Sequence, residues 1–316
     1  MVNARDIESR IDGVKNVRQI TRTMKAVASA KLNRAQDRIE RARAYAHDIG
    51  HTIRQVLARH SEIEHEFFHG EHSGGELSEE EDTNPAYIIL TGDRGLCGSY
   101  NSNIFRRAEK RIEESSEPTI YCVGEAGANY FTRYDEIVRK TYSNIWDELD
   151  YERSFPITDR LIEDYLETDI TSVTVIYNEF ESAMVQHIRE YPLLPLNRAD
   201  FYSFESGPED NGPEHPEVLT DESEESHIFD YKYEPNAEML IDRLFPRHVR
   251  TQVYTTMLEA YAALQGARMI AMDNATENAN EMIDELTLEY NQVRQSSITR
   301  EIADITGGAE ALREDS

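Results

Sequence analysis

The distribution of proline divides this chain of 316 residues into three parts. All ten prolines fall between Pro85 and Pro246, so the first 84 residues and the last 70 contain none. Because proline breaks the interior of a helix, both ends of the chain are free to form long helices. At a rise of about 1.5 Å per residue, such helices would extend roughly 80 to 100 Å, so each needs a partner along its length.

Both ends also carry the apolar spacing of a coiled coil. From Ala28 to Val56, apolar or small residues recur in alternating steps of four and three, which predicts a heptad seam. Upstream, an apolar stripe is offset by one residue, which predicts an inserted three-residue step, a stammer, that overwinds the supercoil. That upstream stripe consists of Ile7, Ile11, Val14, Val17, Ile20, Met24 and Val27. A longer and less regular seam runs from Val249 to Ile305.

Charge and composition favour pairing of the two ends with each other. Residues 1–60 hold 13 Lys or Arg and 6 Asp or Glu, whereas residues 237–316 hold 7 and 14. Opposite charges and many alanines suit an intrachain pair, with a homodimer of either helix as the alternative. We expect an N-terminal helix over 1–60, a globular domain over 61–236 and a C-terminal helix over 237–316.

The middle part alternates strand-like and helix-like segments. Strands are expected at Ala86–Thr91, Thr119–Val123 and Ser172–Tyr177, with helices at Ser102–Glu114 and Ala126–Tyr134. This alternation predicts an open α/β sheet, so the fold class is a long antiparallel coiled coil with an inserted open α/β (Rossmann-like) domain. Two acidic segments, 61–84 and 203–230, contain no Lys or Arg and are expected to be solvated loops.

The net charge of −28 argues against nucleic acid as a partner, because phosphate binding needs a concentrated cationic surface. An acidic excess of this kind suits either a salt-loving organism or simple solubility. Only Cys97 and Cys122 are present, which does not make a disulfide framework. The sequence has neither an apolar run long enough to span a membrane nor the pattern of a secretory signal, so a cytosol-like compartment is expected.

One motif suggests zinc chemistry. The run His65 to His69 reads H-E-F-F-H, and His72 follows as a possible third ligand. On a helix this spacing would place two imidazoles on one face beside a glutamate that acts as general base. The motif lies where the first helix gives way to an acidic segment with no surrounding core, so chance occurrence is the better interpretation.

A second motif suggests nucleotide binding, and a third suggests glycosylation. Gly92, Gly95 and Gly98 follow a strand and precede a helix, where backbone amides can bind phosphate. Their spacing matches neither G-x-G-x-x-G nor the P-loop, and the nearby pair Gly124 and Gly127 is incomplete, so a tight turn is expected. The sequon at Asn274 lies within a predicted helix. No cofactor, metal or catalytic residue is therefore expected.

Three sequence blocks resemble the gamma subunit of F-type ATP synthases, in order and over nearly the whole chain. The first is DIESRIDGVKNVRQITRTMKAVASAKLNRAQ, the second is LTGDRGLCGSYNSNIF, and the third is RMIAMDNATENANEMIDELTLEYNQVRQSSITREIADITGGAEAL. They are similar to the opening helix, the D-R-G-L-C-G turn and the closing helix of that family. The segment SAMVQHIREYPLLPL fits only loosely in its first half. The acidic segment 203–230 matches in position the one that carries a redox cysteine pair in chloroplast members, but no cysteine lies beyond Cys122.

The resemblance implies a function for the fold. In that family the coiled coil is a central stalk that rotates within three alpha and three beta subunits, while the globular domain rests with epsilon on a membrane c-ring. One such subunit per complex couples ion flow to ATP synthesis or hydrolysis and regulates ATPase activity, without catalysis of its own. The resemblance implies a peripheral location on the cytoplasmic face of the bacterial plasma membrane, which is reached only through the complex.

The resemblance also implies which residues contact the alpha/beta ring. Met24 and Lys25 match the part of the shaft that passes an acidic loop of beta. Arg268, Arg294 and Gln295 match a region that engages a catch on beta. The expected apolar tip, which turns in an apolar sleeve, comprises Ile302, Ile305 and Leu312. The alternatives are a zinc hydrolase, a nucleotide-binding α/β protein and a free-standing coiled-coil adaptor.

Overall fold

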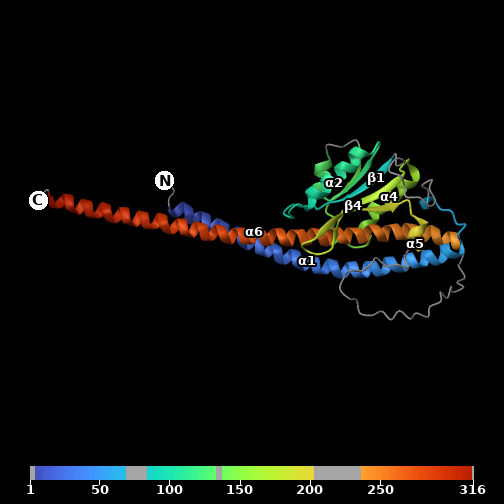
Figure 1. Cartoon of the computed structure of the whole chain (residues 1–316), viewed down its shortest axis with the longest axis horizontal. Coiled ribbons are helices and arrows are strands. Elements are labelled where there is room, and N and C mark those ends of the chain that lie inside the picture. Colours follow the sequence, from blue (N-terminus) through green and yellow to red (C-terminus); the bar gives the residue numbers. More distant parts are fainter. Residues whose placement is uncertain (1–3, 69–83, 133–136, 203–235, 315–316) are drawn as a thin grey trace. The chain divides into compact units, whose positions relative to one another are not determined.

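The chain forms two compact units, and two long helices contribute to both of them. The computed structural model describes residues 4–68, 84–132, 137–202 and 236–314. Unit 1 comprises residues 1–31, 96–98 and 265–316, and unit 2 comprises residues 32–95 and 99–264. The shared helices are α1 (Ala4–Arg59) and α6 (Ala237–Glu314) (Figure 1). The long terminal helices are therefore confirmed, while the division into three domains stays a prediction.

Unit 2 contains a five-stranded sheet in the order β3-β2-β1-β4-β5. The strands β1 to β4 run parallel, and β5 pairs antiparallel with β4. Their bounds are Pro85–Leu90 (β1), Thr119–Val123 (β2), Val138–Tyr142 (β3), Ser172–Phe180 (β4) and Gln186–Leu194 (β5). The three predicted strands are confirmed as β1, β2 and β4, so the open α/β architecture is as expected.

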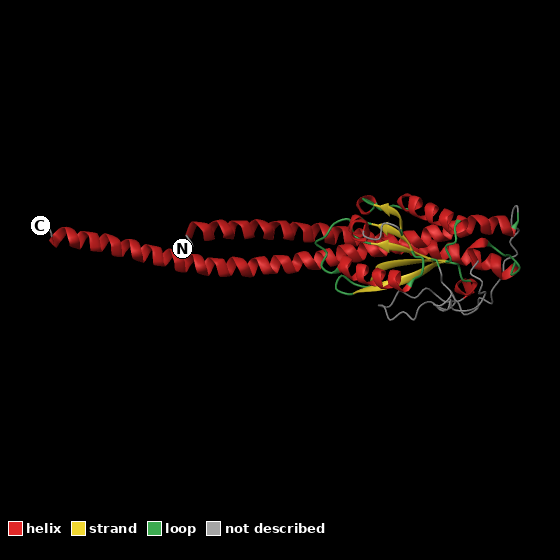
Figure 2. Cartoon of the chain, turned by 90° about the horizontal axis from the view of Figure 1, so that it is seen from above, coloured by secondary structure: helices red, strands yellow, loops and turns green. Residues whose placement is uncertain are grey.

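Helices connect the parallel strands, as is usual for crossovers within a parallel sheet. Among the described residues of unit 2, the helices besides α1 and α6 are α2 (Tyr100–Glu114), α3 (Glu125–Phe131), α4 (Phe155–Glu167) and α5 (Arg198–Tyr202) (Figure 2). Short 3-10 turns occur at Glu66–Phe68, Trp146–Glu148 and Glu152–Ser154. Every residue of β1 is buried, as expected for a strand covered on both faces.

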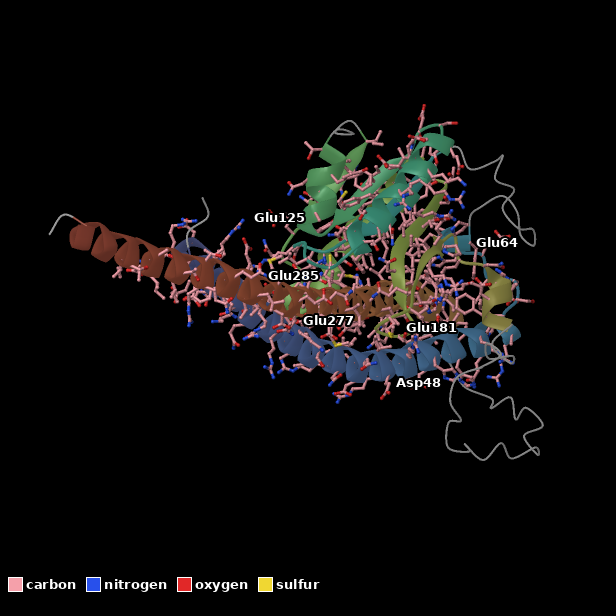
Figure 3. The ribbon with its side chains drawn as sticks, turned by 60° about the vertical axis from the view of Figure 1, so that its left-hand side comes forward. Asp48, Glu64, Glu125, Glu181, Glu277 and Glu285 are labelled. Carbon is pink, nitrogen blue, oxygen red and sulfur yellow. The ribbon has the colours of Figure 1, made fainter. Side chains whose placement is uncertain are left out.

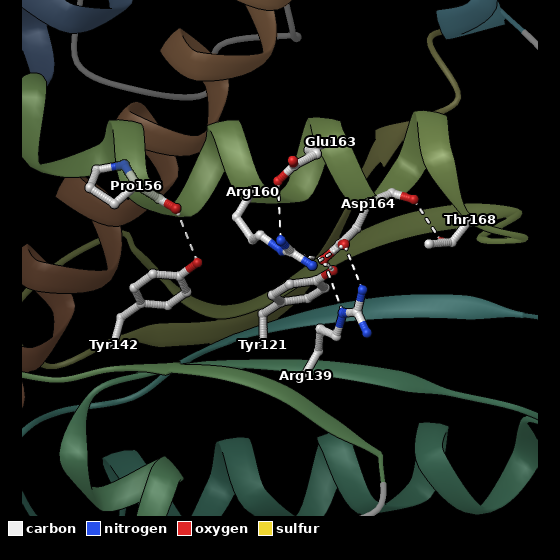
Figure 4. A network of polar contacts seen from close by, with 8 residues as sticks. All are labelled: Tyr121, Arg139, Tyr142, Pro156, Arg160, Glu163, Asp164 and Thr168. Carbon is white, nitrogen blue, oxygen red and sulfur yellow. Dashed lines mark hydrogen bonds and ion pairs between the residues drawn. The ribbon is translucent and has the colours of Figure 1, made fainter.

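A buried carboxylate ties α4 to the β3 side of the sheet. Asp164 on α4 accepts a hydrogen bond of 2.6 Å from the hydroxyl of Tyr121 on β2 (Figure 4). The guanidinium groups of Arg139 on β3 and Arg160 on α4 reach the same carboxylate at 2.9 and 2.7 Å. Burial raises the pKa of Asp164, but the hydrogen bonds from Arg139, Tyr121 and Arg160 outweigh it and hold that pKa below its usual range.

The heptad seam on α1 keeps a single register, so the predicted stammer is wrong. The three stripe residues Val17, Ile20 and Val27 are 51%, 58% and 51% exposed. The seam positions between Ile11 and Ala28 are taken instead by residues that are buried or half-buried, namely Val14, Arg18, Thr21 and Lys25. The expected seam from Ala28 onward is confirmed, with Ala46 half-buried and the others buried.

The two long helices run antiparallel in each unit. In unit 1, Arg18, Thr21 and Lys25 meet Asn280, Thr276 and Asp273 respectively, so the α6 number falls as the α1 number rises. The same direction holds in unit 2, where Arg43 pairs with Glu259. In unit 1 this register places Ala4 beside Arg294, and α6 continues alone beyond that level (Figure 2). The antiparallel pairing of the terminal helices is therefore confirmed.

Candidate partner-binding surface

The seam of unit 1 contains three successive polar contacts between α1 and α6, which we call the polar ladder. A nitrogen of the Arg18 guanidinium donates to the side-chain oxygen of Asn280 at 3.1 Å. The hydroxyl oxygens of Thr21 and Thr276 lie 2.7 Å apart. The ammonium of Lys25 lies 2.5 Å from a carboxylate oxygen of Asp273. These contacts explain why polar residues occupy seam positions, because each one meets a polar partner on the other helix.

Apolar side chains lie on the outside of α1 at the same level. We call Val17, Ile20, Met24 and Val27 the outer stripe; Met24 is half-buried, and the other three are exposed. Their steps of three, four and three residues place them along one side of the helix. Arg10 and Lys31 occupy the positions one heptad before Val17 and one heptad after Met24. The outer stripe is therefore an apolar surface with basic ends.

The outer stripe and the polar ladder invert the usual pattern of a coiled coil. Apolar residues normally occupy the seam, and polar residues the outside. An exposed ion pair such as that of Lys25 and Asp273, with side chains 41% and 51% exposed, contributes about 0 to 1 kcal/mol. Val17, Ile20 and Val27 are about half-exposed, so each loses roughly 1 kcal/mol of the stabilisation that full burial would give. Contact with another protein is one way to recover that free energy.

The two predicted contact residues of α1 differ in their surroundings. Met24 belongs to the outer stripe, whereas Lys25 belongs to the polar ladder and already pairs with Asp273. Lys25 therefore has a partner within the chain, which the spacing alone did not reveal. Its ammonium can also reach a second acceptor, because the side chain is half-exposed and an ammonium carries three donors.

Among the predicted contact residues of α6, Arg268 is half-buried, whereas Arg294, Gln295, Ile302 and Ile305 are exposed. Arg268 donates to the side chain of Gln265 at 3.1 Å, one turn earlier on the helix. Arg294 and Gln295 are exposed, and Gln295 lines a shallow, open hollow with neighbours on the same helix. Ile302 and Ile305 are 57% and 67% exposed on the part of α6 that continues past α1. The side chain of Leu312 lies outside the described residues.

A junction in unit 2 was not predicted from the sequence. Glu259 on α6 is largely buried; its carboxylate lies 2.8 Å from the guanidinium of Arg43 on α1 and accepts a hydrogen bond of 3.1 Å from Tyr177 on β4. Burial and the neighbouring Glu259 raise the pKa of the Tyr177 phenol above its usual range. In the sequence, this contact is indicated only by Glu259, the one charged residue between Arg250 and Arg268.

The turn from β2 into α3, with Gly124 before the helix and Gly127 in its first turn, is built for packing. The first three amides of α3 are occupied, because Glu125 N donates to Asp93, Ala126 N to the carbonyl of Gly92 and Gly127 N to the hydroxyl of Thr91. A β-carbon at Gly124, where φ is +104°, would lie 2.1 Å from the Thr91 carbonyl oxygen. These glycines let α3 approach the end of β1, and the occupied amides leave little for a phosphate.

The described part of the H-E-F-F-H motif, residues 65–68, does not form the α-helix that a zinc site of this spacing needs. Residues Glu66–Phe68 form a 3-10 turn, and Nδ1 of His65 accepts a hydrogen bond of 3.1 Å from the backbone nitrogen of Phe67. Nε2 of His65 lies 3.4 Å from Asp242. His69 and His72 lie outside the described residues. Within the described ranges, no cluster of three or more His, Cys, Asp or Glu side chains is arranged to hold a metal ion.

Acidic side chains are spread over the surface of both units. Exposed examples occur on α1, α3, α6, the β4–β5 turn and the segment after α1, as Figure 3 shows for Asp48, Glu125, Glu277, Glu285, Glu181 and Glu64. In the part of the chain that the structure describes, no helix combines the length and apolar character needed to cross a membrane. The acidic segment 203–230 and most of 61–84 lie outside the described residues.

Comparison with known proteins identifies the family. The sequence matches the family described as ATP synthase over residues 3–312. It is 40% identical to the ATP synthase gamma chain of Salinibacter ruber, with 99% of each chain covered. It is 36% identical to the gamma chain of Symbiobacterium thermophilum, with 98% of this chain and 99% of that one covered.

Solved structures show the same fold at lower identity. A chain of the Euglena gracilis mitochondrial ATP synthase (OSCP/F1/c-ring, rotational state 3) has a TM-score of 0.62 and 19% identity, covering 98% of this chain and 94% of that one. A chain of the Tetrahymena thermophila mitochondrial ATP synthase central stalk and c-ring has a TM-score of 0.56 and 24% identity, covering 81% and 99%. The family match and the long alignments agree that this chain belongs to the family of ATP synthase gamma chains, the non-catalytic central-stalk subunits of that enzyme.

Proposed function

We propose that this chain is the rotating shaft that couples ion flow through a membrane c-ring to ATP synthesis and hydrolysis at alpha and beta subunits. The observation that carries this proposal is the antiparallel pair of α1 and α6, in which α6 continues alone beyond Arg294. Interhelical packing along the pair stiffens it, and a stiff element can pass torque between partners that bind different parts of it.

The partners follow from the family and from the surface. Three alpha and three beta subunits surround the shaft, and epsilon and the c-ring bind at the other end of a subunit present once per complex. The relatives in mitochondrial assemblies are named as rotor, central stalk and c-ring structures, which supports this arrangement. For this bacterial-type chain we infer a peripheral position on the cytoplasmic face of the plasma membrane. By turning within the ring, the subunit also regulates ATPase activity.

The outer stripe is the surface that we assign to beta. Its exposed valines and isoleucine, together with Arg10 and Lys31 at its ends, suit a partner segment that is acidic and carries apolar side chains. Charges at the rim of an interface raise the association rate and orient the partners more than they raise the affinity. Arg268, Arg294 and Gln295 supply polar contacts, whereas Ile302, Ile305 and Leu312 form a tip with few polar bonds to break in each revolution.

A labelled rotor tests the proposal directly. Met184, in the turn between β4 and β5, is 84% exposed, whereas the native Cys97 and Cys122 are buried. Met184→Cys therefore offers a selective attachment point for a bead in a complex immobilised through its alpha and beta subunits. We expect ATP to drive stepwise, one-directional rotation of the bead. A bead that stays still while ATP is hydrolysed, with attachment verified, would contradict the proposal.

A further inference from the structure

Two stripes run side by side on α1 between Val14 and Ala28. One carries the α1 members of the polar ladder (Arg18, Thr21 and Lys25), and it faces α6. The other is the outer stripe, which is offset by one residue and faces away. Since each residue of an α-helix turns by about 100°, a rotation of that size would turn the outer stripe toward α6 and the ladder residues away from it.

The sequence permits both orientations. A seam through Val14, Val17, Ile20, Met24 and Ala28 contains extra three-residue steps before Ile20 and four-residue steps after it. The extra three-residue steps overwind the helix pair, and the extra four-residue steps unwind it by the same amount. The two effects cancel, so the segments before Val14 and after Ala28 keep their register. The rotated orientation would remove more apolar surface from water, which favours it. The observed orientation is therefore maintained by something other than apolar burial.

We propose that the polar ladder locks the rotational orientation of α1, so that the outer stripe is presented to a partner. A polar residue at a seam position is known to fix the register of coiled coils at some loss of stability. In this view Arg18, Thr21 and Lys25 are positioning residues. The consequence for beta rests on the proposed function, whereas the lock itself is a property of this chain alone.

The central contact is the most specific part of the lock. Thr21 is 7% exposed, and the hydroxyl of Thr276 also lies 2.7 Å from the carbonyl oxygen of Met272 on its own helix. The hydroxyl of Thr21 likewise lies 3.0 Å from the carbonyl oxygen of Arg18 on its own helix, so one hydroxyl donates across the seam while the other donates to its own backbone. Rotation would turn the Thr21 hydroxyl away from Thr276 and place Ile20 against it. The loss of the hydrogen bond across the seam opposes this change.

The contacts of Arg18 and Lys25 lie on either side of the central contact, and both also favour the observed orientation of α1. Lys25 and Asp273 are each about half-exposed, so their charged ends remain in contact with water while they pair. Arg18 is half-buried and reaches Asn280 in the same way. Rotation would separate both pairs. The three contacts thus favour the same orientation independently.

Chemical labelling of Ile20→Cys in the purified full chain measures the orientation without any partner. In the observed orientation a cysteine at position 20 is exposed, and it should react readily with a maleimide. In a ladder variant (Arg18→Ala, Thr21→Ala, Lys25→Ala) we expect α1 to rotate and labelling to slow by about tenfold, because the cysteine then faces α6. A disulfide between Ile20→Cys and Ala279→Cys, a buried seam position of α6, should form only in this variant.

A matched control separates the lock from general loss of charge. Lys15→Ala, Arg22→Ala and Thr23→Ala remove the same residue types from exposed positions of the same helix without touching the ladder. This control should label at the native rate. Equal labelling of the native, control and ladder chains would overturn the proposal. Faster labelling of the ladder variant would overturn it too, since it would show opening of the pair and not rotation.

Charge exchange provides a second test with a milder change. Lys25→Glu places a carboxylate beside Asp273, and we expect it to slow the labelling of position 20. Combining it with Asp273→Lys restores an ion pair in the reverse sense, and labelling should return to the native rate. If the double exchange labels like the single one, the ion pair does not help to set the orientation. Failure of the bead to rotate in the assembled complex would affect the proposed function and leave these results standing.

Discussion

The phenol of Tyr177 donates a hydrogen bond of 3.1 Å to the largely buried carboxylate of Glu259. The same carboxylate pairs with Arg43, so one side chain of α6 joins the central sheet to α1 within unit 2. A buried charge with partners on two sides is costly to leave unpaired, and this predicts how the unit responds to loss of each partner.

We expect Tyr177→Phe to lower the free energy of unfolding by about 1 to 2 kcal/mol, because the carboxylate loses one donor. Glu259→Ala should cost about 3 kcal/mol, since it leaves the phenol without its acceptor and opens a gap beneath Arg43. Glu277→Ala, at an exposed position of α6, is the control and should change the free energy of unfolding by less than about 0.5 kcal/mol. Urea unfolding followed by circular dichroism measures all three, and equal midpoints would contradict the prediction.

The turn after β2 gives a sharper prediction. Gly124→Ala would place a methyl group against the Thr91 carbonyl at a positive φ, so we expect destabilisation of about 3 kcal/mol or more. Gly95→Ala is the matched control, because a β-carbon there meets nothing within 4 Å. Gly95→Ala should leave the free energy of unfolding unchanged or raise it slightly. Similar melting temperatures for the two variants would show that the close approach of α3 to β1 is not required.

The Asp164 network predicts a pH dependence. The pKa of Asp164 lies below the ordinary value of about 4 in the folded chain, so the stabilisation is fully present above that value. It is lost as the pH falls from about 4 through the lower folded pKa. Asp164→Asn should therefore cost about 3 kcal/mol at neutral pH, and the difference from the native chain should shrink below about pH 4.

Unfolding in urea at a series of pH values between neutral and about pH 3 measures this difference. Asp169→Asn, at an exposed carboxylate near the end of α4, is the control and should show little difference at any pH. A cost for Asp164→Asn that stays constant across the range would mean that the charge of Asp164 does not matter to the fold.

Sequence patterns predicted the parts of this fold in which burial and spacing coincide. The seam from Ala28 to Val56 is apolar throughout, and the strands β1, β2 and β4 are rich in apolar and β-branched residues, so both were predicted correctly. The edge strand β3 reads VRKTY with three exposed central residues, and it gives no such signal. The edge strand β5 contains charged residues and a proline, and was missed for the same reason.

The candidate surface was harder to predict, for a related reason. A search for apolar spacing placed Val17, Ile20 and Val27 on the seam, because they are the apolar residues at helical spacing in that stretch. The structure gives the seam to Arg18, Thr21 and Lys25, whose partners lie about 250 residues away on α6. Long-range polar pairing is not visible in local periodicity, so this part required the structure.

The end of the paired region yields the last prediction. The register of α1 and α6 places Ala4 beside Arg294, so Arg294 and Gln295 lie where α6 loses its intrachain partner and their polar groups are exposed. We expect Arg294→Ala with Gln295→Ala to lower ATPase activity and ATP-driven ion pumping of the reconstituted complex several-fold, since these groups would bind the ring. The chain itself should stay folded, because neither side chain is buried.

The exposed neighbour Asn291, one turn earlier on α6, supplies the control for that experiment. Asn291→Ala changes a polar side chain on the same exposed helix, so it should leave both activities near the native level if the effect is specific to Arg294 and Gln295. Circular dichroism and subunit composition verify folding and assembly in each case. Unchanged ATPase and pumping in the double variant would remove these two positions from the proposed contact with beta, whereas a loss shared with Asn291→Ala would point to helix stability and not to a contact.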